Sequence, residues 1–518
     1  MAKIISAAEA AALVENGITL GISGFGAFAS PDTVLDEIGK KFRNTNSPRD
    51  LTIVSGVAPG DFIEDGCGLS KIRDEGIIKT LIASHLRMSP AIGRACSENK
   101  IAAFSMPLGV YGQLMSAIGS KRPGIVTHVG LGTYADPRQQ GCIMNEAAKA
   151  QGRQIVQLLE IDGAEMLFYK SFHIDMCILH ACYADELGNI SLENEPVHGD
   201  LLELAAAVHN NGGTVIVEVD QIVMANSLDP RNVLIHRSYV DYIVKAENSS
   251  NQALAYDPRL VGDIRVPAAN SLAPLPLSYK KVIMRRAILE LKKDSLVNLG
   301  IGIPAGVANV ANEEGLSDQL TLSLETGIYG GVPLDGPLFG AAVGPVSISR
   351  SADMFVTYDG GGLDMTVLGC AEIDPLGNVN VSKFAGRCVG PGGFVNISQN
   401  TPKVCFAFSF TSGRSDIQIR DGKLDIVQDG QGIKFIDSLE QISFSSSHAQ
   451  KTGQQVFFIT ERAVFQIING KLTLTEIAPG VDLEKHILGK MAFVPEISPN
   501  LKLMDARLFM PEKMGMVL

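Results

Sequence analysis

The chain has 518 residues, of which 46% are hydrophobic and 19% charged, so it can form about two to four globular domains and is not intrinsically disordered. Its formal net charge of −12 excludes nucleic acid as the main partner, because the chain has no excess of basic groups to neutralise phosphates. No apolar run reaches about 18 residues and the start lacks a signal peptide's pattern, so we expect a soluble protein that does not bind membranes.

The eight cysteines are scattered, and none forms a Cys-x-x-Cys pair. In a chain of this length such spacing predicts reduced thiols in the core of a cytoplasmic protein. A zinc site or a disulfide framework is disfavoured.

The first half begins with an alternation of helix and strand signals. Residues 6–17 form an Ala-rich helical pattern with Ser6 as a possible N-cap. A short strand, 18–22, leads into a glycine loop, and later a helix at 201–210 precedes a strand at 214–219. This alternation favours an α/β fold with mostly parallel sheets.

The first glycine loop, GISGFGAFASP at residues 21–31, invites a dinucleotide-binding interpretation. Its spacing is Gly-x-x-Gly-x-Gly, and no clear acidic strand end follows some twenty residues later. A nicotinamide cofactor is therefore disfavoured, and a tight strand-to-helix turn is the simpler interpretation.

Three further residues have side chains suited to catalysis or metal binding. Cys67 is a weak candidate nucleophile, because no histidine partner is identifiable from the sequence. His173 and His180 could be metal ligands, but their spacing fits no common site. We expect satisfied or surface histidines and no metal.

The second half repeats the plan of the first. A helix begins at residue 282, and a strand (296–301) and a glycine loop (302–306) follow it. DMTVLGCAEIDPLGNV repeats DMCILHACYADELGNI 189 residues later, with matched pairs Asp185/Asp374, Leu187/Leu376, Gly188/Gly377 and Asn189/Asn378. LTLSLETG follows LTIVSG after 269 residues, so the first half carries about 80 extra residues between these blocks.

This self-similarity predicts two homologous open α/β domains with mostly parallel sheets. We place them at 1–280 and 281–518, with the boundary in the Pro-rich stretch 266–281. Alternating segments after residue 411 predict strands, so residues 411–518 form a β-rich extension of the second domain.

Glu325 stands out because it ends the apolar strand pattern LTLSL and glycines follow at once. An exposed acid at a strand end is the ordinary interpretation. A carboxylate held in a dry site among backbone donors would instead be a potential nucleophile. The small residues after it would then let a substrate and backbone N–H groups approach closely.

Several glycine loops in the second half follow strands, and such loops collect at the crevice where α/β sheets bind ligands. They are LGIGIPAG (299–306), YDGGGLD (358–364) and GPGGFVNI (390–397). Bare backbone in such loops can offer N–H groups to a phosphate or an oxyanion.

Together these residues resemble the family I CoA-transferases, in which the two halves correspond to fused α and β subunits. The resemblance rests on ETGIYGGVP, LGIGIP and GPGGFVNI, and it extends over nearly the whole chain through VGLGTYADPRQQGC, AVHNNGG, FITERAVFQI and EIAPGVDLEKHIL. The sequence is most similar to the acetate/propionate type, which exchanges CoA between short-chain acyl-CoAs and acids.

The resemblance implies a specific chemistry. Glu325 matches the family's catalytic glutamate, which forms a glutamyl-CoA thioester in a ping-pong exchange. The CoA-binding and oxyanion loop would be Gly300, Ile301, Gly302, Ile303 and Pro304, with Gly392 and Gly393 as the second contributor. CoA is then a substrate, no cofactor is permanently bound, and family analogy suggests a homotetramer.

Two features depart from the family pattern. Pro107-Leu108-Gly109 stands where relatives commonly carry Pro-Gln-Gly, and the loop SGFGAFASP is closer to the 3-oxoacid CoA-transferases. Both would lie near the acyl pocket, so the acid specificity stays open among acetate, propionate, butyrate and acetoacetate. An acyl-CoA hydrolase on the same scaffold, or a CoA-binding protein without turnover, are the alternatives.

Overall fold

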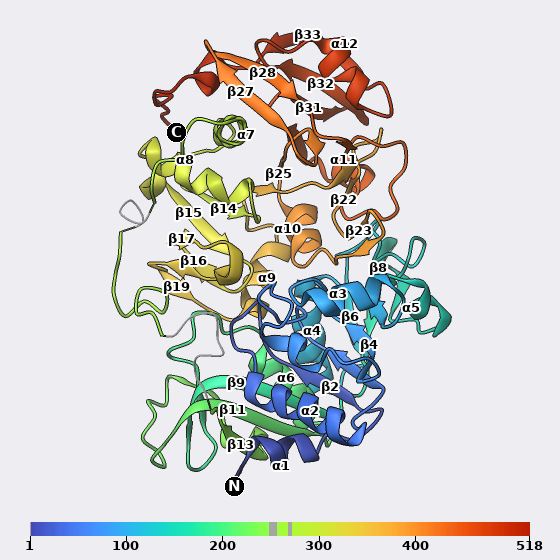
Figure 1. Cartoon of the computed structure of the whole chain (residues 1–518), viewed down its shortest axis with the longest axis vertical. Helices are drawn as coiled ribbons and strands as arrows, with labels where there is room; N and C mark the ends of the chain where they lie inside the picture. Colours follow the sequence, from blue (N-terminus) through green and yellow to red (C-terminus); the bar gives the residue numbers. More distant parts are fainter. Residues whose placement is uncertain (1, 248–255, 268–271) are drawn as a thin grey trace.

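Two large β-sheets, one from each half of the chain, lie along the long axis of the molecule (Figure 1). The computed structural model describes residues 2–247, 256–267 and 272–518. Part of the predicted boundary stretch, 268–271, lies outside the described residues, so the boundary near residue 280 stays a prediction.

The first sheet is parallel along its whole main path. Its order is β1 (Lys3–Ile5), β13 (Tyr242–Lys245), β11 (Thr214–Val223), β9 (Met176–Asp185), β2 (Thr19–Ile22), β3 (Leu51–Val54), β4 (Ile78–Ile82) and β5 (Ala102–Phe104), with β10 (Ile190–Ser191) and β12 (Val233–Ile235) attached beside β9. Central β9 is buried on both faces, as its nearly unbroken apolar sequence requires in a parallel sheet.

The second sheet has a parallel centre and antiparallel additions. Its order is β19 (Ser347–Ile348), β16 (Ile328–Tyr329), β15 (Leu320–Leu324), β14 (Ser295–Leu299), β20 (Met365–Leu368), β25 (Lys403–Ala407), β30 (Gln455–Ile459), β31 (Ala463–Ile468), β32 (Lys471–Ile477) and β33 (Glu496–Leu503).

The centres of the two sheets have the same strand order. β13-β11-β9-β2-β3 corresponds to β30-β25-β20-β14-β15. The repeated Asp-x-Leu-Gly-Asn segment also folds identically: the Asp185 carboxylate accepts the N–H groups of Leu187 and Asn189, and Asp374 accepts those of Leu376 and Asn378. The fold therefore confirms the predicted pair of homologous α/β units.

Helices and small strand pairs cover and connect these sheets (Figure 1). The helices are α1 (Ala7–Ala12), α2 (Asp32–Thr45), α3 (Pro90–Ser97), α4 (Leu108–Gly119), α5 (Glu146–Ala150), α6 (Leu201–His209), α7 (Tyr279–Ile288), α8 (Val307–Glu313), α9 (Ser351–Asp359), α10 (Phe394–Asn400), α11 (Ser446–Thr452) and α12 (Leu483–His486). Ser6 caps α1 and pairs with Glu9 in a capping box, as its sequence predicts.

The small sheets lie outside the two large ones. They are β6 (Gly124–Thr127) with β7 (Val156–Ile161) and β8 (Ala164–Lys170), and the pairs β17 (Val332–Pro333) with β18 (Ala342–Val343), β21 (Glu372–Ile373) with β22 (Val379–Asn380), β23 (Lys383–Phe384) with β24 (Arg387–Cys388), β26 (Thr411–Ser412) with β29 (Gly432–Ile433), and β27 (Asp416–Arg420) with β28 (Lys423–Gln428).

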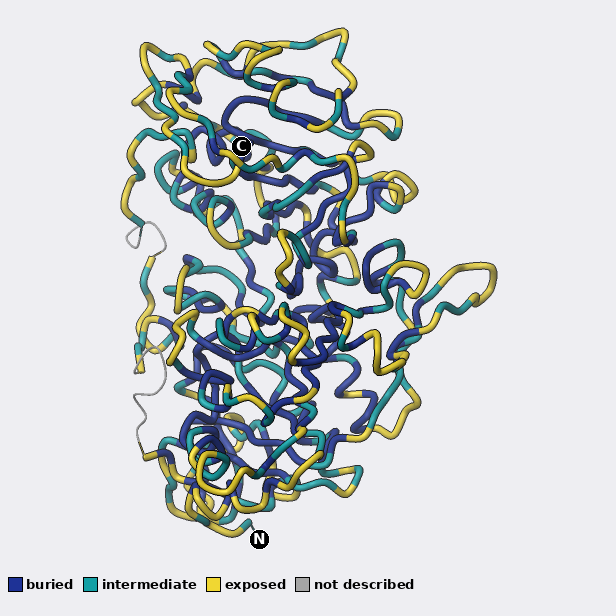
Figure 2. Tube along the Cα trace, turned by 45° about the vertical axis from the view of Figure 1, so that its right-hand side comes forward, coloured by how far each residue is buried: buried dark blue, intermediate teal, exposed yellow. Residues whose placement is uncertain are grey.

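The segment after residue 411 is β-rich, as predicted, but it is not only an appendage. β30 pairs in parallel with β25 and completes the central array, whereas β31 and β32 continue the sheet antiparallel. Figure 2 shows buried residues along the chain trace in both halves of the molecule. None of the described helices combines the length and apolarity needed to cross a bilayer.

Candidate active site

Glu325 lies directly after β15, at the edge where the parallel strands of the second sheet end. The register pairs Asn298 with Ser323, so the chain after β14 leaves the sheet beside Glu325. β20 pairs with β14 on its other side and ends at Leu368. The glycine-rich segments at 300–306 and 369 therefore emerge at the same edge as the carboxylate.

The Glu325 carboxylate is half-buried and accepts no hydrogen bond from any residue that the structure describes. A Cβ added at Gly393 would lie 3.1 Å from Glu325 Oε2, so the backbone of this loop packs directly against the carboxylate. Burial raises the pKa of Glu325 to about 7, because the charged form has lost part of its water and gains no donor from the residues that the structure describes. An incompletely solvated carboxylate is a good nucleophile.

The predicted loop Gly300 to Pro304 offers unused backbone donors beside this group. The Gly300 N–H donates to Val367 (2.8 Å), which fixes the start of the loop. The N–H groups of Ile301, Gly302 and Ile303 have no acceptor within the described part of the chain. Gly302 has a φ of +79°, a left-handed conformation that favours glycine.

Gly392 and Gly393 have different roles. The Gly392 N–H donates to the Ser84 carbonyl (3.0 Å) and its carbonyl accepts from Leu108 (3.2 Å), so both of its backbone groups bind the first half. The Gly393 N–H has no acceptor among the described residues, and this residue is the one that touches Glu325. Gly392 therefore positions the loop, and Gly393 is the available donor.

The structure explains the glycines after Glu325 in a way that the sequence did not suggest. Gly327 has a φ of +108°, and a Cβ there would lie 2.1 Å from the Ser349 carbonyl. At Gly331 a Cβ would lie 2.6 Å from the Val343 carbonyl. These glycines allow neighbouring backbone to pack closely around β16–β19, and the crowding of the carboxylate comes from Gly393.

Two residues that were not predicted hold the site together. The Ser351 hydroxyl, at the start of α9, donates to the Glu325 carbonyl (2.9 Å). Asn396 is fully buried, accepts from the Gly109 N–H (3.2 Å) and donates to Asp359 (2.8 Å), so it links the two halves. Asn396 lies within the GPGGFVNI motif, but only the fold reveals its partners.

The other residues considered as nucleophile or metal ligands are Cys67, His173 and His180, and their surroundings fit structural roles. Burial raises the pKa of the Cys67 thiol, with Asp32 and Asp61 opposing ionisation further, so no reactive thiolate is expected. His173 is exposed beside Asp175, and Nε2 of the buried His180 lies 3.5 Å from Glu195.

His180, Glu195 and Asp220 lie close enough together to hold a metal ion. Burial opposes protonation of His180, but hydrogen bonds to Glu195 and Glu218 outweigh it and raise its pKa to about 10. A metal could bind here only by displacing this proton, and the expectation that the protein holds no metal stays a prediction.

A partly buried carboxylate beside backbone N–H groups that have no acceptor among the described residues is an arrangement that can carry out acyl transfer. The family model described as Coenzyme A transferase matches residues 4–246. Caffeate CoA-transferase of Acetobacterium woodii is 42% identical over 518 residues, which cover 98% of each chain. Acetate CoA-transferase YdiF of Escherichia coli (strain K12) is 40% identical over 99% of this chain and 96% of its own.

Solved structures agree over the whole chain. The apoenzyme of the acyl-CoA transferase YdiF from Escherichia coli O157:H7 superposes with a TM-score of 0.94 at 39% identity, covering 100% of this chain and 98% of the other. A YdiF thioester complex with CoA superposes with a TM-score of 0.93 at 38% identity and the same coverage. The chain therefore belongs to the coenzyme A transferase family, and it is an enzyme of that class.

Proposed function

We propose that the protein transfers CoA between a short-chain acyl-CoA and a free carboxylic acid, with Glu325 as the nucleophile. The observation that carries this proposal is the Glu325 carboxylate itself, which packs against Gly393 at the edge of a parallel sheet and accepts no hydrogen bond from the described residues. The solved structure of YdiF as a thioester complex with CoA supports the same kind of intermediate.

The first half-reaction has two steps. A Glu325 oxygen attacks the thioester carbonyl, the C–S bond breaks, and CoA leaves as a thiolate from an acyl-glutamyl anhydride. The thiolate then attacks the glutamyl carbonyl, the C–O bond to the acyl group breaks, and the free acid leaves as a carboxylate. The product is a glutamyl-CoA thioester. No proton is gained or lost, so the exchange needs no general acid.

The second half-reaction reverses these steps with another acid. Its carboxylate attacks the glutamyl-CoA thioester, the thiolate leaves and attacks the new acyl carbonyl, and Glu325 is regenerated. Each step passes through a tetrahedral oxyanion. We assign its stabilisation to the free N–H groups of Ile301, Gly302, Ile303 and Gly393, with Gly300, Pro304 and Gly392 shaping the CoA-binding loops.

Mass spectrometry tests this assignment. After brief incubation with acetyl-CoA and a panel of other acyl-CoAs, without acceptor acid, we expect a CoA-sized mass gain on the peptide that contains Glu325. The Glu325→Gln variant should show none. Steady release of free CoA without an adduct would support the hydrolase instead, and neither adduct nor release with any donor would overturn the nucleophile assignment.

We further propose that the enzyme works in the cytoplasm as a homotetramer without a permanently bound cofactor. All eight cysteines are buried and free, which supports a reducing compartment. Sedimentation equilibrium should give a mass near four chains. A mass near the 55.2 kDa of one chain would refute the tetramer.

A further inference from the structure

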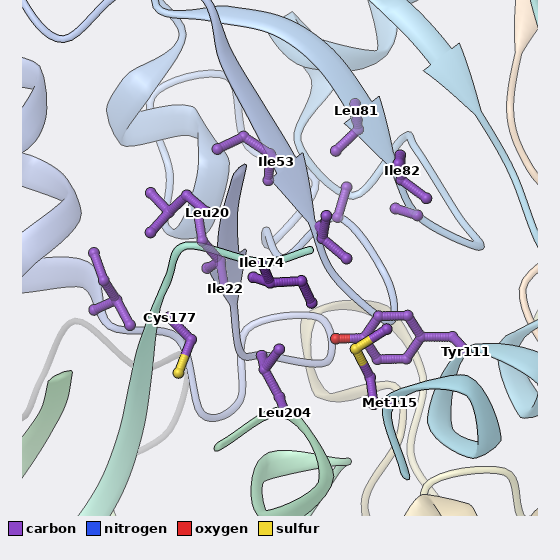
Figure 3. Close-up of a cluster of buried hydrophobic side chains, with 14 of the residues drawn as sticks. Leu20, Ile22, Ile53, Leu81, Ile82, Tyr111, Met115, Ile174, Cys177 and Leu204 are labelled. Atoms are coloured by element: carbon purple, nitrogen blue, oxygen red, sulfur yellow. The ribbon is translucent and has the colours of Figure 1, made fainter. Parts of the chain in front are cut away.

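A buried group of ionisable side chains interrupts the apolar core of the first sheet. Figure 3 shows the apolar side chains of Leu20, Ile22 and Cys177 in the core around β2 and β9. His180 follows three residues later on β9 and is only 2% exposed, but its neighbours are carboxylates. Burying an imidazole among acids is costly, so the arrangement calls for a physical explanation.

Three carboxylates surround the His180 ring. Its Nε2 lies 3.5 Å from Glu195 Oε1 and 3.7 Å from Asp220 Oδ1. On the other side of the ring, Nδ1 lies 3.6 Å from Glu218 Oε1. A charge-assisted hydrogen bond from nitrogen to a carboxylate is typically about 2.7–2.9 Å long, so all three distances are longer than in a close ion pair.

The spacing around Nε2 fits a metal ion instead. Zinc bonds of about 2.0–2.2 Å to nitrogen and oxygen place tetrahedral ligand atoms about 3.3–3.6 Å apart, close to the 3.5 and 3.7 Å found here. One ligand atom from each of His180, Glu195 and Asp220 lies within 4.8 Å of the other two. Imidazole and carboxylate groups are ordinary zinc ligands, and water can supply the fourth.

Glu218 holds the far side of the ring. Its carboxylate accepts the N–H groups of Thr33 (3.2 Å) and Val34 (2.9 Å) in the first turn of α2, and its Oε1 faces His180 Nδ1. A metal-bound imidazole commonly directs its second N–H toward such a carboxylate, which orients the ring. The structure thus contains both a set of ligands and a group that aims one of them.

The negative charge in this cluster exceeds what one histidine can balance. Asp220 Oδ1 is buried and has no hydrogen-bond partner among the residues that the structure describes. Burial raises the pKa of Asp220 to about 6, with Glu195 and Glu218 adding to the shift and His180 opposing it. A divalent cation beside this oxygen would relieve the repulsion more strongly than a proton can.

The second half shows that the repeated scaffold does not require these groups. Three of its positions correspond to them by the offset of 189 residues: Gly369 to His180, Ala407 to Glu218, and Ser409 to Asp220. The same strands therefore pair in the second half without an ionisable cluster. The acids and the histidine belong to the first half alone.

We propose that His180, Glu195 and Asp220 bind a divalent first-row metal ion, for which Zn²⁺ fits best. Binding displaces the proton on His180 Nε2 to solvent, and Glu218 then orients the neutral ring. The ion is structural, and no step of the proposed acyl transfer uses it. This proposal replaces the expectation of no metal, because β9, β11 and the segment after β10 bring together ligands whose spacing in the chain is irregular.

Metal binding by the full-length protein, first stripped with a chelator, tests the proposal. Titration with Zn²⁺ against a chromophoric chelator should show one site per chain with a Kd below about 1 μM. Asp220→Asn and Glu195→Gln should each weaken binding at least about a hundredfold, and Glu218→Gln about 10–100-fold. Co²⁺ should give the visible absorption of a tetrahedral site in the unmodified protein and lose it in Asp220→Asn.

His173→Gln is the matched control. His173 Nε2 lies 3.2 Å from Asp175, but both side chains are exposed, so this variant should bind Zn²⁺ as the unmodified protein does. Zn²⁺ should also raise the thermal midpoint of the unmodified protein, and midpoints without metal establish that each variant is folded. Asp220→Asn keeps the test decisive if Glu195→Gln does not fold, since Asp220 is only partly buried.

A Kd above about 1 μM would overturn the inference and leave the cluster as an ion network. An affinity that Asp220→Asn, Glu195→Gln and Glu218→Gln all leave unchanged would also overturn it, because the ion would then bind elsewhere. The measurement does not depend on turnover. A Glu325 adduct without Zn²⁺ binding therefore sinks only this inference, whereas Zn²⁺ binding without an adduct sinks only the proposed function.

Discussion

The two halves of the molecule have the same scaffold, but different residues lie at the edge where the carboxyl ends of its parallel strands meet. Asp175 accepts the Thr19 N–H (2.7 Å) at the start of β2, and Asp364 accepts the Leu296 N–H (2.8 Å) at the start of β14. In this alignment Gly56 stands at the end of β3, where the second half has Glu325 after β15.

Gly56 and its neighbours serve a different purpose. Gly56 lines a small cavity together with Tyr111, Leu204 and Ser351, and its carbonyl accepts the Ser84 N–H (2.9 Å). Ser84 in turn accepts the N–H of Gly392 from the second half. One copy of the scaffold thus carries Glu325, the proposed nucleophile, and the other supplies an anchor for the second half's loop. A repeated fold does not imply a repeated active site.

The sharpest test of this asymmetry is Glu325→Gln. We expect transferase activity to fall about a thousandfold or more, because the amide cannot form the thioester and the first half has no carboxylate at the equivalent position. Initial rates with a saturating donor and acceptor measure this. Activity within tenfold of the unmodified enzyme would mean that another group attacks.

Gly393→Ala should lower kcat about a hundredfold, because the added Cβ would lie 3.1 Å from Glu325 Oε2 and 3.2 Å from the Phe355 ring. Gly369→Ala is the matched control, since it lies at the same edge and its Cβ would meet nothing within 4 Å. If both variants lose activity equally, the loss comes from contact with substrate and not from displacement of Glu325.

The rate of adduct formation should depend on pH through Glu325. Burial raises the pKa of Glu325 to about 7, so below pH 7 the fraction of Glu325 in the reactive carboxylate form should fall about tenfold per pH unit. Single-turnover labelling between pH 5 and 9 measures the apparent pKa. A flat profile down to about pH 5 would show that the carboxylate is better solvated than its surroundings indicate.

Glu325 should also cost stability. Its pKa is raised from 4.5 to about 7 in the folded protein, so above pH 7 the folded state carries the full penalty of the buried charge, up to about 3 kcal/mol. Glu325→Gln should therefore raise the thermal midpoint at pH 8. This gain should shrink as the pH falls from 7 to 4.5, and an equal gain at pH 4.5 would point to packing instead of charge.

The smallest expected effect concerns the two matched Asp-x-Leu-Gly-Asn turns. Asn378 is buried, and its Oδ1 accepts the Ser446 N–H (2.8 Å), whereas the half-buried Asn189 accepts a longer hydrogen bond from Arg237 (3.2 Å). Asn378→Ala should cost about 1–2 kcal/mol and Asn189→Ala about 1 kcal/mol or less. Denaturation midpoints measure both, and the reverse order would show that burial does not decide the difference.

Much of the fold could be predicted from the sequence. The strand segments ending in glycine loops, the capped first helix and the Asp-x-Leu-Gly-Asn repeat depend on local periodicity and turn chemistry. The parallel role of β30 could not be predicted, because strand order depends on pairing between residues far apart in the chain. The sequence therefore indicated a β-rich extension after residue 411, but it did not indicate that this segment supplies a strand of the central sheet.

The candidate site divides in the same way. By itself the sequence determined which residue is the candidate nucleophile and which loops are bare, because an acid at an apolar strand end and runs of glycine are local patterns. Only the tertiary structure decided that Gly393 packs against Glu325, that the Gly392 amide is already used, and that the buried His180 lies among carboxylates. These facts depend on distances between segments far apart in the chain, which packing sets and no local pattern records.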